Sequence, residues 1–116
     1  MHELSLCDDL LSQVVAIAAQ NHAKSVESVT VQIGALSGVE PSLLDSAFTM
    51  IKAGTVAEQA LLILQTTPVI VLCRLCGAKS EVTANRLLCS ACQSADTSLI
   101  SGNELILASV ALNCVD

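Results

Sequence analysis

Two short motifs, Cys73-Arg74-Leu75-Cys76-Gly77 and Cys89-Ser90-Ala91-Cys92, decide how the second half of this chain folds. A Cys-x-x-Cys loop directs two thiolates toward one point, and two such loops complete a tetrahedron, the geometry that Zn²⁺ accepts from four sulfurs. We therefore predict a metal site, with zinc as the favoured metal, on Cys73, Cys76, Cys89 and Cys92. Gly77 suits the left-handed turn that follows such a loop, whereas the second motif is followed by the less permissive Gln93.

The cysteine spacing alone allows three other interpretations. Two disulfides would satisfy it, but we expect no secretory signal, because Glu3, Asp8 and Asp9 occupy the place of a positively charged n-region. A redox dithiol of the thioredoxin type needs a single motif that opens a helix. An iron site of the rubredoxin type uses the same four sulfurs, and the spacing does not exclude it.

The composition predicts one small domain, or one domain with an appended lobe. The chain has 116 residues, of which 53% are apolar, and Phe48 is its one aromatic residue, so the core is built from aliphatic side chains. The longest uninterrupted apolar run, Val14 to Ala19, is far shorter than the ~20 residues of a spanning helix, so we expect no membrane association. Six cysteines without a secretory signal favour metal ligation in the reducing cytoplasm.

The formal charge of −6 is unevenly distributed. Residues 69–102 carry three basic and two acidic side chains, while the rest of the chain carries two basic and nine acidic ones. Four thiolates and one Zn²⁺ would make residues 69–102 about neutral to negative. Because binding to a phosphate backbone needs a clustered basic face, we expect no nucleic-acid partner.

Hydrophobic periodicity outlines the elements around the two motifs, since apolar residues recur every three to four positions in a helix and every second position in a strand. Pro41 marks the first position of a helix, Gly54 its C-terminal cap, and Gly102-Asn103 a two-residue hairpin turn. The predicted elements are, in order, a helix at 4–22, a strand at 28–33, a helix at 41–53, strands at 61–65 and 69–72, and a hairpin formed by 99–101 and 104–112.

These elements predict an α+β fold in which a small sheet with two helices receives an inserted four-cysteine zinc-knuckle domain. The returning strand is expected to lie beside the earlier strands, so residues 1–68 and 103–116 form one domain and residues 69–102 the insertion. Structural zinc can supply ~10–16 kcal/mol in small domains, so folding of the insertion should depend on its metal.

Three residues of metal-binding type are predicted not to be ligands. Cys7 falls on the apolar face of the first helix, where a thiol packs as a small hydrophobe. His22 lies near the C-terminal end of that helix, where a histidine is favourable for structural reasons. Cys114 lies outside the two motifs.

The N-terminal sequence Met1-His2-Glu3 places an imidazole one residue from a terminal amine. An amine with a pKa of about 7.7–8.0 and an imidazole near 6.5 are both available as neutral donors around cytosolic pH. Backbone nitrogens between them can close chelate rings with a metal that favours square-planar nitrogen coordination, Ni²⁺ or Cu²⁺. On composition alone, however, a histidine at position 2 is weak evidence for a metal site.

Several segments are informative because of the order in which they follow one another along the chain. They are Met1-His2-Glu3-Leu4-Ser5-Leu6, Ile33-Gly34-Ala35-Leu36-Ser37-Gly38-Val39-Glu40-Pro41, Ala47-Phe48, Gly54-Thr55-Val56-Ala57-Glu58, the two cysteine motifs, and Ser101-Gly102-Asn103-Glu104-Leu105. In this order and spacing, the sequence resembles the HypA/HybF family of hydrogenase-maturation nickel metallochaperones over essentially its whole length.

The resemblance implies a nickel-binding α+β domain and a structural zinc domain on the four cysteines. The implied Ni²⁺ ligands are the terminal amine of Met1, the backbone amides of His2 and Glu3, and the His2 imidazole. The implied role is delivery of nickel to the large subunit of [NiFe] hydrogenase, with the GTPase HypB as partner. The family's second motif usually reads Cys-Pro-x-Cys-Gly, so Ser90 and Gln93 depart from it, which bears on the rigidity of that loop rather than on its ligands.

Two other classes of function fit parts of the sequence. A zinc-ribbon interaction module, for instance a transcription-associated protein, would bind through the cysteine-rich lobe, but that lobe lacks the basic and aromatic residues for nucleic acid. An electron carrier would hold iron in the same four-thiolate site. No enzyme is predicted, because the chain has no nucleophile and base at a recognisable spacing and its four-cysteine site is coordinatively closed.

Overall fold

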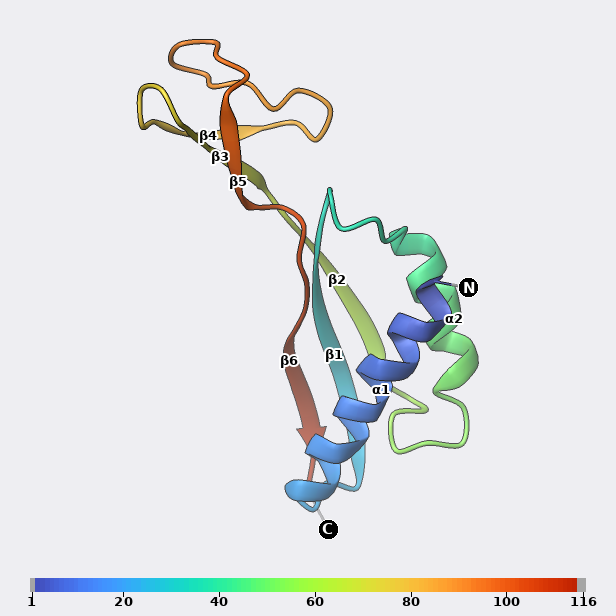
Figure 1. The fold of residues 1–116 in the computed structure, drawn as a ribbon. Coiled ribbons are helices and arrows are strands. Elements are labelled where there is room, and N and C mark those ends of the chain that lie inside the picture. Colours follow the sequence, from blue (N-terminus) through green and yellow to red (C-terminus); the bar gives the residue numbers. More distant parts are fainter. Residues whose placement is uncertain (1, 115–116) are drawn as a thin grey trace. The chain divides into compact units, whose positions relative to one another are not determined.

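The computed structural model describes residues 2–114, and of His2 the backbone alone. Eight elements follow one another along the chain (Figure 1): α1 (His2–Gln20), β1 (Ser25–Gly34), α2 (Pro41–Ile51), β2 (Leu61–Thr67), β3 (Val69–Cys73), β4 (Lys79–Val82), β5 (Thr97–Ser101) and β6 (Leu105–Asn113). The strands form two three-stranded sheets, one in the order β2-β1-β6 and the other in the order β4-β3-β5. The predicted α+β class is therefore confirmed, and so is the position of the returning strand β6 beside β1.

Two compact units divide the chain. The first comprises Met1–Val31, Val39–Gln65 and Ile106–Asp116, and the second comprises Gln32–Gly38 and Thr66–Leu105. The end of β1 belongs to the second unit because its backbone is bonded there: Gly34 N donates to Glu104 O at 2.8 Å, and Leu36 N donates to Gly102 O at 2.7 Å.

Aliphatic packing between the helices and one face of the sheet forms the core of the first unit (Figure 1). Val14, Leu44 and Phe48 are at most 2% exposed. Val29, Val31 and Ile33 of β1 are buried and the residues between them are not, which is the period-two pattern of a strand with one covered face. Cys7 is fully buried among them, so its predicted burial is confirmed.

Helix α2 begins where the sequence predicts, but it ends at Ile51 with Lys52 as its C-cap, so the predicted end at residue 53 and the capping role of Gly54 are wrong. Pro41 stands at its first position, where the missing N–H of proline costs no hydrogen bond, and Glu40 precedes it in an extended conformation. Gly54 follows the helix with a φ of 78°, a left-handed conformation that glycine adopts without strain.

The predicted hairpin at Gly102-Asn103 is wrong. β5 and β6 belong to different sheets, so the chain passes from one sheet to the other at this point instead of turning back. The physical reason is that Gly34 N, at the end of β1, donates to Glu104 O, and Leu36 N, just after β1, donates to Gly102 O. These hydrogen bonds take the place of the pairing that a hairpin would form.

Smaller differences concern β4 and α1. Strand β4 was not predicted, because its residues Lys79-Ser80-Glu81-Val82 carry almost no apolar signal, but it pairs antiparallel with β3. Helix α1 begins at His2 and ends at Gln20, and His22 lies beyond it, exposed, with a φ of 54°. Within residues 2–114, no helix combines the length and apolar character that crossing a membrane requires.

Candidate metal centre

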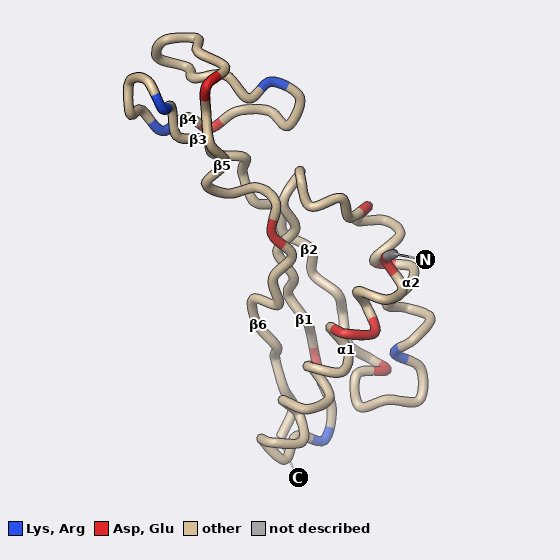
Figure 2. Tube along the Cα trace, viewed as in Figure 1, with Lys and Arg blue, Asp and Glu red and all other residues tan. Residues whose placement is uncertain are grey.

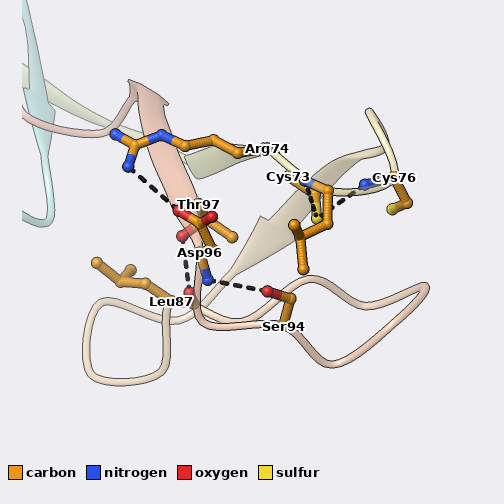
Figure 3. A network of polar contacts seen from close by, with 8 residues as sticks. Cys73, Arg74, Cys76, Leu87, Ser94, Asp96 and Thr97 are labelled. Atoms are coloured by element: carbon orange, nitrogen blue, oxygen red, sulfur yellow. Dashed lines mark hydrogen bonds and ion pairs between the residues drawn. The ribbon is translucent and has the colours of Figure 1, made fainter.

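The first cysteine motif forms a loop at the end of β3. The amide groups of Leu75 and Cys76 both donate to Cys73 Sγ, at 3.4 Å each (Figure 3). In addition, Gly77 N donates to Cys73 O at 3.1 Å. Gly77 has a φ of 76°, the left-handed conformation expected from the sequence. The Cys73 and Cys76 side chains therefore both project from one tight turn.

The second motif repeats this geometry without a glycine. Cys92 N donates to Cys89 Sγ at 3.5 Å, and Gln93 N donates to Cys89 O at 2.8 Å. Gln93 takes the position that Gly77 holds in the first loop and adopts a φ of 65°. A non-glycine residue is strained in this left-handed conformation, so the second loop carries a conformational cost that the first loop avoids.

The four sulfur atoms come together in one cluster. All Sγ atoms of Cys73, Cys76, Cys89 and Cys92 lie within 4.8 Å of one another, with separations of 3.6 Å for Cys73–Cys92 and 3.5 Å for Cys76–Cys89. A zinc–sulfur bond of ~2.3 Å in a tetrahedron places its sulfurs about 3.8 Å apart, so the cluster fits a tetrahedral metal ion. These separations are far longer than a disulfide bond of ~2.0 Å, and all six cysteines are free.

Hydrogen bonding divides the thiols into two kinds. Backbone amides, first that of Cys76, lower the pKa of Cys73, and the amide of Cys92 together with that of Ala91 lowers the pKa of Cys89 to about 6. For Cys76, the amide of Ala78 acts to lower the pKa, but the neighbouring thiols of Cys89 and Cys73 outweigh it and the pKa is raised.

Cys92 follows the pattern of Cys76. The amide of Ser94 acts to lower its pKa, but Cys73 and the other thiols raise it to about 12. The first cysteine of each motif therefore loses its thiol proton readily, whereas the second cysteine resists the loss of its proton, because that loss would add negative charge to the cluster. A divalent cation would remove that resistance, because it neutralises the charge that the second pair of thiolates adds.

Polar contacts hold the loop between β4 and β5 against the first motif (Figure 3). Arg74 pairs with Asp96 at 3.2 Å, and Arg74 N donates to Asp96 O at 2.9 Å. Asp96 N donates to Ser94 Oγ at 3.0 Å, and Thr97 Oγ1 donates to Leu87 O at 2.9 Å. The ion pair is exposed and contributes little by itself, whereas the backbone bond fixes the position of the loop. Sequence patterns gave no signal for these partners.

The predicted nickel residues are only partly described. Met1 and the side chain of His2 lie outside the described residues, while the backbone of His2 begins α1. Glu3 lies in the first turn of α1, and its Oε2 accepts a hydrogen bond of 3.3 Å from Glu40 N, at the start of α2. The four cysteines are therefore brought together by the structure, and the N-terminal ligands are not tested by it.

The remaining two cysteines, Cys7 and Cys114, are not members of the four-sulfur cluster. Cys7 Sγ donates to Leu44 O at 3.2 Å, and burial, followed by the charge of Asp45, raises the pKa of Cys7 to about 11. Cys114 is exposed, with its Sγ 3.7 Å from Asn21 O.

The two units differ in net charge (Figure 2). By sequence, the first unit carries two basic and eight acidic residues, and the second carries three of each. The whole formal charge of −6 therefore belongs to the first unit, while the unit with the cysteine cluster is neutral before any thiolate is counted.

The fold and the cluster define this chain as a small α+β protein with a four-cysteine metal site. A family model described as "Hydrogenase/urease nickel incorporation, metallochaperone, hypA" matches residues 1–112. The chain therefore belongs to the HypA family of nickel-incorporation metallochaperones, as the sequence resemblance predicted.

Relatives and solved structures agree with this family. Two proteins named hydrogenase maturation factor HypA, from Aquifex aeolicus (strain VF5) and Nitrosospira multiformis, are each 46% identical to this chain over 112 residues, which is 97% of this chain and of each relative. The solution structure of the Ni metallochaperone HypA from Helicobacter pylori is 28% identical, with a TM-score of 0.70 over 97% of this chain and 98% of that one. Another solution structure, of HypA protein, is 29% identical, with a TM-score of 0.77 over 99% of this chain and 98% of that one.

Proposed function

We propose that this chain binds Ni²⁺ at its N-terminus and passes it on during the maturation of [NiFe] hydrogenase. The observation that carries the proposal is the family match over residues 1–112, whose description names nickel incorporation. The proposed ligands are the terminal amine of Met1, the amides of His2 and Glu3, and the His2 imidazole. This set offers four nitrogens in fused chelate rings, the donor type that suits square-planar Ni²⁺.

The start of α1 supports this assignment. The backbone of His2 is already helical, and the Glu3 carboxylate is bonded to Glu40 N. The proposed ligands therefore adjoin a defined helix end rather than a long tail. A site of nitrogens at a chain end is open to a competing acceptor, which a protein that delivers its metal requires.

For the cysteine cluster we propose a structural Zn²⁺ held by Cys73, Cys76, Cys89 and Cys92. Four thiolates fill the tetrahedron and leave no position for a substrate, so the ion would stabilise the fold and not catalyse a reaction. Thiolate ligands also require a reducing compartment, which agrees with the cytoplasm.

We further propose that residues 1–68 and 103–116 form the nickel-binding domain and residues 69–102 the zinc-binding domain. The two compact units support this division, although they place 32–38, 66–68 and 103–105 with the cysteine-rich unit. As partners we propose a HypB-type GTPase and the hydrogenase large subunit. The names of the relatives, which are hydrogenase maturation factors, support this proposal.

The experiment that tests the nickel site is calorimetry on untagged protein. Wild type should bind Ni²⁺, and His2→Ala should abolish specific binding without loss of zinc. A few residues added before Met1 should have nearly the same effect, because they convert the terminal amine into an amide. His22→Ala is the matched control, since it removes the chain's other histidine from an exposed position. Comparable nickel affinity in wild type, His2→Ala and the extended form would refute the proposed ligands.

A further inference from the structure

Ser80 is the one polar residue that is buried within the described part of the chain, with 4% of its surface exposed. It lies in β4, where its backbone pairs with Val71 of β3, which is itself 1% exposed. Burial of a hydroxyl is unfavourable unless the hydroxyl is hydrogen-bonded, so the partners of Ser80 explain why it is tolerated there.

Both partners of the Ser80 hydroxyl belong to one residue of the second cysteine motif. Ser90 N donates to Ser80 Oγ at 3.0 Å, and the hydroxyl oxygens of Ser80 and Ser90 also lie 3.0 Å apart, so one of them donates to the other. Ser90 directly follows Cys89, which is fully buried. β4 in turn begins shortly after the first motif, with Cys73 N donating to Ala78 O at 2.9 Å.

Ser80 therefore connects the two motifs through protein atoms and not through the metal. The second motif needs such support more than the first, because Gln93 holds a left-handed conformation that Gly77 adopts freely. Side chains that position metal ligands without touching the metal typically change metal affinity 10–100-fold when they are removed.

We propose that Ser80 is a positioning residue for the metal site: through Ser90 it holds Cys89 in place, so that the four sulfurs are arranged before the metal enters and the metal leaves slowly. This inference rests on the proposed zinc site. Loss of the hydroxyl in Ser80→Ala leaves Ser90 N–H without its acceptor beside a buried ligand, which is unfavourable in the metal-bound state.

The test measures zinc release to excess EDTA from the full chain. Ser80→Ala should release zinc about 10-fold faster than wild type, the lower end of the range for such positioning residues. Ser80→Thr, which keeps the hydroxyl, should release it at close to the wild-type rate. Ser101→Ala is the matched control, because it also removes one serine hydrogen bond from the same unit, that to Pro68 O at 3.1 Å, away from the cysteines.

A double-mutant comparison separates positioning from general stability. Proline has no N–H to leave unpaired and suits the second position of a turn, which Ser90 occupies after Cys89. In a Ser90→Pro background, Ser80→Ala should therefore no longer accelerate zinc release. The Co²⁺-substituted forms should all show the absorption of a four-thiolate site, since no ligand has been removed.

The outcomes distinguish the two proposals. Release from Ser80→Ala at the wild-type rate, or an equal acceleration in the wild-type and Ser90→Pro backgrounds, would overturn the role of Ser80. Cys89→Ser tests the site itself: undiminished zinc in that variant would overturn the metal centre, whereas zinc loss there with unchanged release from Ser80→Ala would overturn only the positioning role.

Discussion

Among glycine-to-alanine changes in the second unit, Gly34→Ala is expected to be the most damaging, because the added methyl group would collide with the backbone between β5 and β6. A Cβ at Gly34 would lie 2.1 Å from Gly102 O, 2.2 Å from Gly102 C and 2.7 Å from Asn103 N. All three are backbone atoms, which cannot rotate away as a side chain could. The methyl group can be accommodated only if the two chain segments separate by more than 1 Å, a shift of the order that ordinary van der Waals contact at about 3.5–4 Å requires.

The magnitude follows from the bonds that such a separation breaks. Gly34 N to Glu104 O, at 2.8 Å, and Leu36 N to Gly102 O, at 2.7 Å, join the same two segments. Each net hydrogen bond contributes ~0.5–1.5 kcal/mol, and a buried group left unpaired costs ~1–3 kcal/mol. Loss of both bonds, with their groups left unpaired, therefore lowers the free energy of unfolding by roughly 2–6 kcal/mol.

Gly38→Ala provides the matched control. Gly38 has a φ of 78° and nothing within 4 Å of the position of a Cβ, so its substitution carries only the conformational cost of a left-handed alanine, about 1–2 kcal/mol. Urea unfolding of the zinc-loaded proteins, followed by far-ultraviolet circular dichroism because the chain has no Trp or Tyr, measures both effects. If Gly34→Ala is no more destabilising than Gly38→Ala, the close approach of the two segments is not a structural requirement.

Three further predictions concern the cysteines, the core and pH. Replacing Cys7 and Cys114 together with Ser should leave zinc and nickel stoichiometry unchanged in metal analysis, and a drop in bound metal with the fold intact would show that one of them is a ligand. Phe48→Ala should destabilise the first unit by about 3–5 kcal/mol in urea unfolding, because this side chain is 2% exposed, while zinc content stays at the wild-type level. The Thr67 hydroxyl, and then the amide of Gly102, lower the pKa of Glu104, so its ionised form stabilises the fold. Glu104→Gln should thus be less stable than wild type at pH 7, and this deficit should shrink as pH falls below the ordinary carboxyl value of about 4.3 and through the lower folded pKa; a deficit that is constant with pH would contradict it.

The elements that the sequence predicted correctly are those whose signal is local. Pro41 marks the start of α2 through its own backbone preference, Gly54 adopts a left-handed conformation in the turn beyond that helix, and the apolar residues of α1 indicate which face is buried. The cysteine cluster is predictable for the same reason, because each Cys-x-x-Cys loop is a local geometry and two such loops supply the four ligands of one tetrahedral metal ion.

The features that escaped prediction depend on partners distant in sequence. Gly102-Asn103 satisfies the local rule for a hairpin, but the carbonyl of Gly102 is bonded to Leu36, and nothing near position 102 signals that partner. β4 has Val82 as its one apolar residue and is a strand because β3 pairs with it. Ser80 gave no signal either, since its importance lies in a contact with Ser90 across the cluster.

The charge distribution gives the two proposed metal sites different physical settings. The cysteine cluster lies in a unit with three basic and three acidic residues, so its hold on a cation must come from the thiolates themselves and from the amides that bond them. The N-terminus lies in a unit with eight acidic and two basic residues, whose potential favours the approach of a divalent cation within a Debye length of ~8 Å at physiological ionic strength. A site that collects nickel by long-range attraction and binds it with few, accessible donors can fill quickly and still release its metal, whereas a closed cluster of four sulfurs retains its ion. This contrast is what a protein needs if one metal is to be carried and the other is to keep the fold in place.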